Sequence, residues 1–426
     1  MKVAIYTLGC KVNTYESEYI TDILKRHNYQ ISSFDDICDI YIINTCTVTN
    51  TSDIKSRKII RQARRKNKDA LIIALGCFTQ ANPKLEIEEV DIWLGNKDKN
   101  KIINYIDDYL KNKKKINKVY NYDELSHNFE DMYIENFTSR TRAFIKIQDG
   151  CENFCSYCII PFVRGKCRSK DFDKVIDEAT SLVNNGFYEI VLTGIHTGNY
   201  GVDLNTNLCT LLKEMVKIKG LKRIRISSIE ITELNDEILG VIKDNDIIVN
   251  HLHIPIQAAS DKVLKVMNRK YDLNYFKEKI KYIKEIKKDV SITTDIIVGH
   301  PGEDNQTFEK SIEDIKEIGF SKLHVFPYSK RDGTKSALME QLDDVTKKAR
   351  AKVLLELSKQ LEIDYMNKFL NREIEVLVEV NKDGYSIGHS TNYLQIKINE
   401  IVPHNTFIKV KITNIDYPYC IGEIIK

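Results

Sequence analysis

The sequence predicts an α/β fold in three parts: a small parallel α/β sheet domain, a partial (β/α)6 barrel and a small antiparallel β-barrel. Three observations favour this class. Strand-like and helix-like patterns alternate within residues 1–115, and they alternate again six times from Ala143 onward. Residues 370–426 instead hold short runs of alternating apolar and polar residues with Gly and Asn between them, which is typical of a small β-barrel.

The first predicted domain, residues 1–115, contains three apolar runs that we interpret as buried strands. These runs are Val3–Leu8, Ile40–Ile43 and Leu71–Leu75, with helical patterns near residues 14–27 and 53–67 between them. Such alternation is typical of a small parallel sheet. A hydrophilic stretch rich in Lys and Asn, residues 111–136, then predicts a linker.

The second predicted domain, residues 137–367, contains six strand candidates. They are Phe144–Gln148, Ile190–Thr193, Arg223–Ser228, His251–Ile256, Ile292–Val298 and Leu323–Pro327. Amphipathic helices are predicted between them, for example over residues 173–185, 233–243 and 273–287, and a long helix over 346–367 leads to the last domain. A complete eight-unit barrel needs about 250 residues, so six units indicate a partial barrel with its active site at the carboxyl ends of the strands.

A cysteine follows each strand of the first domain. Cys10 comes after Leu8-Gly9, Cys46 after Asn44-Thr45, and Cys77 after Gly76. Because ligands of open parallel sheets bind beyond the carboxyl ends of the strands, we expect these three thiols to meet in space. The alternative is that each is a small buried side chain, which is common for an isolated Cys.

Cys151, Cys155 and Cys158 form a CxxxCxxC motif directly after the first strand of the predicted barrel. Three thiolates suit an iron–sulfur cluster that keeps one iron open, whereas a structural zinc site usually has four protein ligands. Zinc bound by these cysteines and Cys167 is the alternative. Zinc ribbons usually show two CxxC pairs, and this sequence has one.

Composition narrows the class of protein. With 42% hydrophobic and 29% charged residues, ordinary cores can form. No apolar run is long enough to span a membrane, and the start of the chain is better explained by a strand than by a signal peptide. We therefore expect a cytoplasmic protein without a membrane partner, in which cysteines bind metal rather than form disulfides.

The net charge is only +3, but basic residues gather in two clusters, residues 55–68 and 139–170. Each cluster is either a solvated surface or a surface that contacts phosphates. The second cluster contains Arg140, Arg142, Lys146, Arg164, Lys166, Arg168 and Lys170. The candidate nucleic-acid contacts are Arg57, Arg61, Arg64, Arg65, Arg164 and Arg168.

On these residues, the central domain resembles the radical S-adenosylmethionine superfamily. Cys151, Cys155 and Cys158 match its cluster motif, and the resemblance implies a 4Fe-4S cluster that cleaves S-adenosylmethionine to a radical. The resemblance also implies that five residues contact the cofactor: Tyr157, Gly194, Ser228, Glu230 and Gly299. The alternative is that these residues only form ordinary turns. No acid–base catalytic residue is assigned.

The whole chain is similar to one subfamily, the methylthiotransferases. Its three N-terminal cysteine motifs are matched by residues 7–13, 44–49 and 76–80, and later signatures by residues 253–257 and 267–271. The resemblance implies a second, auxiliary 4Fe-4S cluster on Cys10, Cys46 and Cys77, whose open iron carries the sulfur to be transferred. It further implies a C-terminal barrel of the TRAM type.

Residues 9–13, 44–49 and 193–196 look most like the branch that adds a methylthio group to C2 of N6-threonylcarbamoyladenosine at position 37 of tRNA. The resemblance implies tRNA, through its anticodon loop, as partner, and leaves the sulfur donor and the electron donor unidentified; we expect a monomer. The alternatives are a methylthiotransferase acting on isopentenyl-adenosine tRNA or on a ribosomal protein, and more remotely a non-catalytic zinc-bearing RNA-binding protein.

Two features depart from the family's pattern. Residues 257–260 read Gln-Ala-Ala-Ser where Gln-Ser-Gly-Ser is frequent, and His300 stands where Phe is frequent. The tail, residues 371–426, holds six basic and seven acidic residues, a net charge of −1, whereas an RNA-binding barrel is normally basic. We expect this tail to use shape, through Tyr385, Tyr393 and Phe407.

Overall fold

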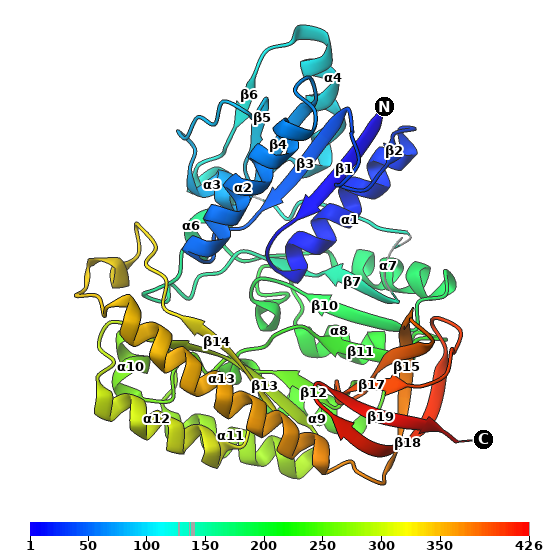
Figure 1. Cartoon of the computed structure of the whole chain (residues 1–426), viewed down its shortest axis with the longest axis vertical. Helices are drawn as coiled ribbons and strands as arrows, with labels where there is room; N and C mark the ends of the chain where they lie inside the picture. The colour runs from blue at the N-terminus through cyan, green and yellow to red at the C-terminus, as the bar shows by residue number, and fades with distance from the viewer. Residues whose placement is uncertain (127, 136, 138–140, 426) are drawn as a thin grey trace.

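The computed structural model describes residues 1–126, 128–135, 137 and 141–425. Arg140 of the second basic cluster and Asn136 at the end of the expected linker lie outside these residues. The predicted three-part α/β architecture is confirmed. Figure 1 shows the N-terminal domain, in blue and cyan, above the green and yellow strands of the central domain, with the red C-terminal barrel at lower right.

The N-terminal domain is a sheet in the order β2-β1-β3-β4-β5-β6, in which every neighbouring pair is parallel. The strands are β1 (Lys2–Thr7), β2 (Gln30–Ile31), β3 (Ile40–Thr45), β4 (Leu71–Gly76), β5 (Ile92–Leu94) and β6 (Ile116–Lys118). The helices are α1 (Lys11–Arg26), α2 (Asn50–Lys66), α3 (Cys77–Ala81) and α4 (Ile102–Asn112), with the 3-10 turn η1 (Lys99–Lys101) before α4.

The sheet extends beyond the predicted boundary at residue 115, because β6 ends at Lys118. The strands β2, β5 and β6 are only two or three residues long, too short for a recognisable pattern. The central strands β3 and β4 are buried at every position, because one apolar cluster packs on each face of the sheet. Phe78 belongs to one cluster and Leu24 of α1 to the other.

The central domain has six parallel strands in chain order. They are β7 (Arg142–Lys146), β10 (Glu189–Thr193), β11 (Arg223–Ile226), β12 (His251–His253), β13 (Ser291–Val298) and β14 (Lys322–Pro327). They form two three-stranded sheets, β7-β10-β11 and β12-β13-β14, which an isolated bridge between Ile224 and Ile248 joins. An open, partial barrel follows from this order.

Helices and short turns fill the connections of the central domain. The helices are α5 (Tyr122–Leu125) in the linker, then α6 (Ile160–Arg164), α7 (Phe172–Asn184), α8 (Leu208–Met215), α9 (Asp236–Asp244), α10 (Asp261–Val266), α11 (Leu273–Ile286), α12 (Asn305–Ile318) and α13 (Asp344–Asn367). The 3-10 turns are η2 (Thr197–Asn199), η3 (Ile231–Glu233) and η4 (Lys335–Leu338), and β8 (Gln148–Asp149) pairs with β9 (Arg168–Ser169). Asp171, Asp304 and Asp343 cap α7, α12 and α13 by accepting a backbone N–H.

The C-terminal domain is a closed barrel in the order β15-β16-β17-β19-β18. Its strands are β15 (Glu373–Lys382), β16 (Tyr385–Ser390), β17 (Gln395–Ile398), β18 (Phe407–Asp416) and β19 (Tyr419–Ile424). The prediction of a purely antiparallel barrel is wrong in one pair, because β17 and β19 are parallel. Five strands cannot alternate in direction around a closed circle, so one neighbouring pair must run the same way.

Candidate functional site

The three strand-end cysteines of the N-terminal domain lie together. Cys10, Cys46 and Cys77 follow β1, β3 and β4, which are neighbours in the sheet. Burial raises the pKa of Cys46 to about 11, and the nearby thiols of Cys77 and Cys10 contribute to the rise. The thiols therefore converge at the carboxyl edge of the sheet, where the sequence predicted that they would meet.

Asn13 links the loops that carry Cys10 and Cys46, and Gly9 allows these two loops to approach each other closely. The amide of Asn13 donates to the carbonyls of Leu8 (2.8 Å) and Thr45 (3.0 Å). A Cβ on Gly9 would lie 3.1 Å from Cβ and 3.2 Å from Sγ of Cys46, and Gly9 has a φ of +102°. Glycine is therefore required where the first loop approaches the second.

Arg164 lies inside the protein beside these thiols. Its side chain is fully buried and donates to Asn13 Oδ1 (2.7 Å) and to Glu16 (2.6 Å). Burial by itself lowers the pKa of Arg164, but the thiols of Cys77 and Cys10 and the nearby carboxylates raise it well above its ordinary value. The prediction that Arg164 contacts RNA is therefore wrong, and its charge instead opposes the rise that burial causes in the pKa of Cys10.

The CxxxCxxC loop lies beyond β7, and two of its thiols have cationic or ring partners. Arg269 donates a hydrogen bond to Cys155 Sγ (3.4 Å), and Cys151 Sγ lies 3.9 Å from Nδ1 of His196. Burial raises the pKa of Cys158, and the thiols of Cys155 and Cys151 raise it further. The three thiols are therefore close enough to interact electrostatically.

Each of these two partners is itself paired with a carboxylate. Arg269 pairs with Glu230, and His196 pairs with Glu233. Burial by itself lowers the pKa of His196, but hydrogen bonds to the Cys151 thiol and to Glu233, among others, raise it to about 12. Oriented partners of this kind around ligating side chains are typical of metal centres.

A cavity of about 360 Å³ lies over the three cysteines. The expected cofactor residues that border it are Tyr157, Gly194, Ser228 and Glu230. Gly299 does not border it, although Ile297 of the same segment does. Gly299 has a φ of +69°, and its backbone N–H donates to Glu303 (2.9 Å), so its visible role is in a turn.

Each set supplies three thiols, a donor set that suits a four-iron cluster with one open iron. Within the described residues, no three His, Cys, Asp or Glu side chains converge closely enough to hold one metal ion. A cube binds each cysteine through a different iron, so its ligands stay apart across the cluster. A tetrahedral zinc site instead needs its ligands around one point, and the fourth candidate, Cys167, points its thiol at the carbonyl of Gly150 (3.8 Å).

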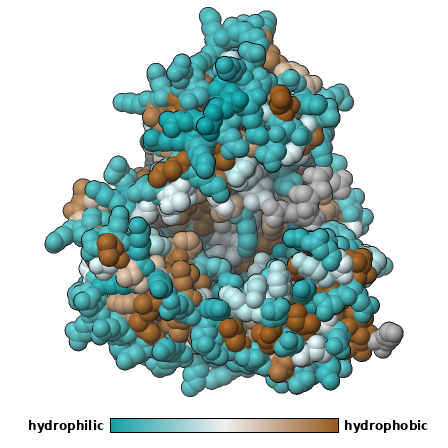
Figure 2. Space-filling view, viewed as in Figure 1, coloured by the Kyte–Doolittle hydropathy of each residue, from teal (hydrophilic) through white to brown (hydrophobic). Residues whose placement is uncertain are grey.

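Cys10 of the N-terminal set faces the same space as the three cysteines of the central set. Cys10 borders the 360 Å³ cavity together with Cys151, Cys155 and Cys158, and it also borders a second cavity of about 620 Å³ inside the barrel. The exposed side of Cys10 therefore faces these cavities, while protein surrounds its other sides. Figure 2 shows the surface hollowed between the N-terminal domain and the two other domains.

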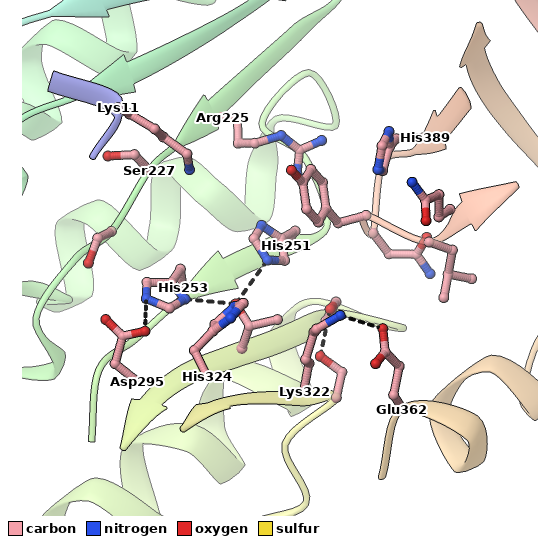
Figure 3. A pocket seen from close by; sticks show the side chains of 18 of the residues that line it. Lys11, Arg225, Ser227, His251, His253, Asp295, Lys322, His324, Glu362 and His389 are labelled. Atoms are coloured by element: carbon pink, nitrogen blue, oxygen red, sulfur yellow. Dashed lines mark hydrogen bonds and ion pairs between the residues drawn. The ribbon is translucent and has the colours of Figure 1, made fainter. Parts of the chain in front are cut away.

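The larger cavity is lined by both polar and apolar side chains and is closed by the C-terminal barrel. Figure 3 shows the side chains that β11 to β14 direct into it, with Lys11 of α1 at one side and His389 of the C-terminal barrel at the other. Tyr393 is stacked between His251 and His389, with ring centroids 4.9 Å and 4.7 Å away. The C-terminal domain thus contributes an aromatic ring to the interior of the barrel.

Several residues of this cavity escaped the sequence analysis: Lys11, Arg225, His251, His253, Asp295 and His324. A signal was present, because Arg223-Ile-Arg225 and His251-Leu-His253 place polar residues at alternate positions of strands that otherwise read as buried. Inward positions of a small barrel are normally apolar, so polar ones indicate a ligand-facing interior. Arg269, likewise, lay in a quoted signature without an assigned role.

The basic residues of α2 divide into exposed and buried ones. Arg57, Arg61 and Arg65 are exposed and, with Lys58, surround a shallow depression of the surface. Arg64 instead points inward and donates to Asp91 (2.7 Å). We therefore keep RNA contact by the three exposed arginines as a prediction and withdraw it for Arg64.

Arg168 is also a structural residue, because its side chain is 8% exposed. It donates to the carbonyls of Arg164 and Lys166, both at 2.9 Å. The prediction that Arg168 contacts RNA is wrong for the same reason as for Arg164: backbone and carboxylate groups within the protein already use the guanidinium.

Three aromatic residues of the tail were expected to give it an RNA-binding shape. Two of them lie at the interface between the tail and the central domain. Phe407 packs against Tyr188 (5.9 Å between ring centroids) and lies under Arg223 (4.8 Å), and Tyr393 is part of the cavity wall. Tyr385 is covered by Lys397 at 4.5 Å. We interpret Phe407 and Tyr393 as residues that dock the tail onto the central domain.

Comparison with protein families gives two matches. The radical SAM superfamily matches residues 145–315, and a family described as uncharacterized protein family UPF0004 matches residues 2–95. The chain is 44% identical to the threonylcarbamoyladenosine tRNA methylthiotransferase MtaB of Bacillus subtilis, over 100% of this chain and 96% of that protein. It is 37% identical to the protein of that name in Aquifex aeolicus, over 93% of this chain and 96% of that protein.

A relative with another named substrate is also similar. The tRNA-2-methylthio-N(6)-dimethylallyladenosine synthase of Endomicrobium trichonymphae is 33% identical over 92% of both chains. Among solved structures, the radical S-adenosylmethionine methyltransferase TsrM from Kitasatospora setae superposes with a TM-score of 0.58 at 14% identity, covering 79% of this chain and 75% of that chain. At that identity the match supports the fold alone. No helix within the described residues is both long and apolar enough to cross a membrane.

Proposed function

The chain belongs to the tRNA methylthiotransferases of the radical S-adenosylmethionine superfamily, and we propose that it adds a methylthio group to C2 of N6-threonylcarbamoyladenosine at position 37 of tRNA. Membership implies S-adenosylmethionine and a 4Fe-4S cluster. That there are two clusters, one on each set of three cysteines, is part of the proposal. So are the cytoplasm as its location and an electron donor and a sulfur donor that the chain does not itself supply.

The observation that carries this proposal is that one cysteine of the N-terminal set borders the cavity that all three cysteines of the central set line. Cys10 lies on the same cavity wall as Cys151, Cys155 and Cys158, although the two sets come from different domains. A substrate base held there would lie between a radical source and a sulfur source. One site alone would explain radical formation but not the transfer of a methylthio group.

When bound, the clusters and S-adenosylmethionine supply electron transfer, radical formation and the methylthio sulfur. The protein's own residues orient the cysteine thiols and place positive charge beside them. Arg269 and His196 place positive charge beside Cys155 and Cys151, and Arg164 does the same beside Cys10. The walls from the N-terminal and central domains exclude water from a base that is inserted between them.

The walls of the larger cavity favour a polar substituent on the adenine. Arg225, His251 and Lys11 border this cavity and offer nitrogen atoms to a polar substituent, whereas an isopentenyl group has no polar atom to pair with them. The MtaB proteins of Bacillus subtilis and Aquifex aeolicus act, by name, on the threonylcarbamoyl form, and these three polar groups support the same substrate here. The base reaches the cavity from a single-stranded anticodon loop, where it can be splayed out of the stack.

Nucleoside analysis of tRNA tests the proposal. Digested tRNA from cells with the gene should contain the 2-methylthio form of the threonylcarbamoyl nucleoside, and tRNA from deletion cells the unmodified form. Reconstituted protein should hold about eight irons, and C10A about four. C155A should no longer cleave S-adenosylmethionine, and C10A should still cleave it without methylthio product.

Cys38 offers a matched control. It is buried in the same domain and precedes β3, whereas Cys46 follows the other end of that strand. C38A should therefore keep both the iron content and the product. A C10A protein that still forms the methylthio nucleoside would refute the two-cluster assignment, and a product found only on isopentenyl-adenosine would refute the proposed substrate.

A further inference from the structure

We propose that Arg225, Lys11 and His251 form a cradle that binds the free carboxylate of the threonylcarbamoyl group and thereby selects this substrate. The inference rests on the proposed function and deepens it. An N6-threonylcarbamoyl group ends in a carboxylate, whereas an isopentenyl group carries no charge, so a cationic cradle separates the two.

Arg225 provides a buried cation with donors that no protein group uses. Its side chain is 2% exposed, and its Nε donates to Glu189 (2.8 Å). Both terminal nitrogens, Nη1 and Nη2, are buried, and neither has a hydrogen-bond partner among the described residues. Buried donors of a charged group are rarely left unpaired, so their pairing with a ligand is the economical explanation.

The position of Arg225 is fixed from two sides. Glu189 holds one edge of the guanidinium, and the ring of Tyr393 lies 4.6 Å from its centre. Neither contact engages the terminal nitrogens of Arg225 in a hydrogen bond. Because these groups form a planar fork, they match the two oxygens of a carboxylate.

Lys11 and His251 complete the cradle. No hydrogen bond or ion pair within the described residues engages the ammonium of Lys11, which borders the same cavity. His251 is 6% exposed, and its Nε2 lies 3.1 Å from Thr293 Oγ1, while its Nδ1 is buried without a partner among the residues that the structure describes. Figure 3 shows the three side chains directed toward one region of the cavity.

Two other basic side chains of this cavity lie beside carboxylates. Lys322 pairs with Glu362 (2.8 Å), and His253 lies 3.3 Å from Asp295. Only one carboxylate, that of Glu189, bonds to a member of the cradle within the described residues. An anion is therefore favoured beside Arg225 and Lys11 rather than elsewhere along the wall. Lys11 directly follows Cys10, so a carboxylate held there would anchor the substituent next to the auxiliary cysteines.

The test compares anticodon stem-loops that carry the threonylcarbamoyl group with stem-loops in which its carboxylate is replaced by the isosteric carboxamide. We expect wild-type protein to bind the carboxylate RNA about 10- to 100-fold more tightly, as measured by fluorescence anisotropy. R225Q and K11Q should bring the ratio of the two affinities toward one, and R225K should give an intermediate ratio.

The ratio of the two affinities distinguishes the loss of one contact from the loss of the fold. A misfolded protein would bind both RNAs more weakly by the same factor and leave the ratio unchanged. K11Q removes a group without protein partners among the described residues and should leave the fold intact. K322Q, which changes a cation of the same cavity that Glu362 already neutralises, should leave the ratio at the wild-type value. Equal wild-type affinities for the two RNAs, or an unchanged ratio in both R225Q and K11Q, would overturn the cradle.

The outcomes for the cradle and for the proposed function are distinct. Equal binding and equal modification of carboxylate and carboxamide RNA would leave the proposed function standing and refute the cradle. Tight and selective binding of the carboxylate RNA without any methylthio product would support the cradle and refute the proposed reaction.

Discussion

Arg269 donates a hydrogen bond to the thiol of Cys155 across 3.4 Å, although 114 residues separate the two along the chain. The same guanidinium pairs with Glu230, which precedes η3 in the loop after β11. Arg269 thus connects a thiol of the CxxxCxxC loop to a carboxylate on the wall of the 360 Å³ cavity. One guanidinium that contacts both groups orients the Cys155 thiol and the Glu230 carboxylate relative to each other.

Replacement of Arg269 should reduce cleavage of S-adenosylmethionine more than it reduces iron content. We expect R269Q to form 5′-deoxyadenosine about 10- to 100-fold more slowly, the usual loss when a partner of a metal ligand is removed. R269K keeps the positive charge but lacks the planar guanidinium, so its rate of 5′-deoxyadenosine formation should lie between those of R269Q and wild type. Chromatography of the cleavage product, beside iron analysis, measures both. An R269Q protein with wild-type cleavage would show that this contact is unimportant for the reaction.

Gly9 is predicted to be necessary for the auxiliary cysteines alone. In G9A the new Cβ would press on Cys46 in a backbone conformation that L-residues avoid, so the first two cysteine loops should separate. We expect reconstituted G9A to hold about four irons instead of about eight and to keep cleaving S-adenosylmethionine.

The matched control for G9A is Gly186, which has a φ of +91° and no described atom within 4 Å of the place that a Cβ would occupy. G186A carries backbone strain of about 1–3 kcal/mol without a clash, so it should lose stability and keep its iron. If G9A and G186A have the same iron content, the close approach of the two cysteine loops does not matter for the cluster.

The sequence predicts features of this fold that depend on pattern and misses those that depend on contacts between distant residues. The strands β1, β3 and β4 are long apolar runs, so both they and the cysteines at their carboxyl ends could be placed. Arg164 could not, because its partner Glu16 lies 148 residues away and no pattern in the chain connects them. From sequence alone, a basic residue within a basic run is predicted to lie on the surface, because the sequence does not show its buried partner.

The cavity inside the barrel illustrates the same limit. Arg225 and His251 alternate with apolar neighbours, which indicates a polar interior but does not say which side chains are already paired. Glu189 engages Nε of Arg225 and leaves the terminal nitrogens free of partners among the described residues, a distinction that only the packed structure provides. The role of Tyr393 was likewise hidden, because it depends on how the tail docks.

Glu16 is predicted to hold the N-terminal and central domains together. Its buried carboxylate contacts Lys99 (2.5 Å) from its own domain, and Lys146 (2.9 Å) and Arg164 (2.6 Å) from the next. E16Q would leave these cations without their counter-charge, so we expect a loss of about 3–5 kcal/mol in the free energy of unfolding. Urea unfolding at pH 7 measures this loss. The control D22N changes a carboxylate of the same helix that pairs with the half-exposed Arg26, and it should cost less than about 1 kcal/mol.

The same carboxylate should make the protein sensitive to acid. Burial by itself raises the pKa of Glu16, but the charges of Arg164, Lys146 and Lys99 hold it well below its usual value. A carboxyl group with a lowered pKa in the folded state contributes stability above its unfolded pKa of about 4.3, and this contribution is lost as the pH falls. Between pH 6 and pH 3, the free energy of unfolding should therefore fall less steeply in E16Q than in wild type. Parallel curves for the two proteins would contradict this assignment.

The exposed arginines of α2 are predicted to contact the phosphates of tRNA. Arg57, Arg61 and Arg65 are four residues apart, so they lie along one face of the helix, and their guanidinium groups are on the surface. The triple variant R57Q/R61Q/R65Q should weaken tRNA binding. The slope of log K against log salt should become shallower by about 2–3, since each lost phosphate contact removes about 0.7–0.9. Filter binding over a range of salt concentrations measures this slope.

R64Q, which alters the inward-pointing arginine of the same helix, should lower stability and leave the slope unchanged. A triple variant with the wild-type slope would mean that tRNA does not approach over α2.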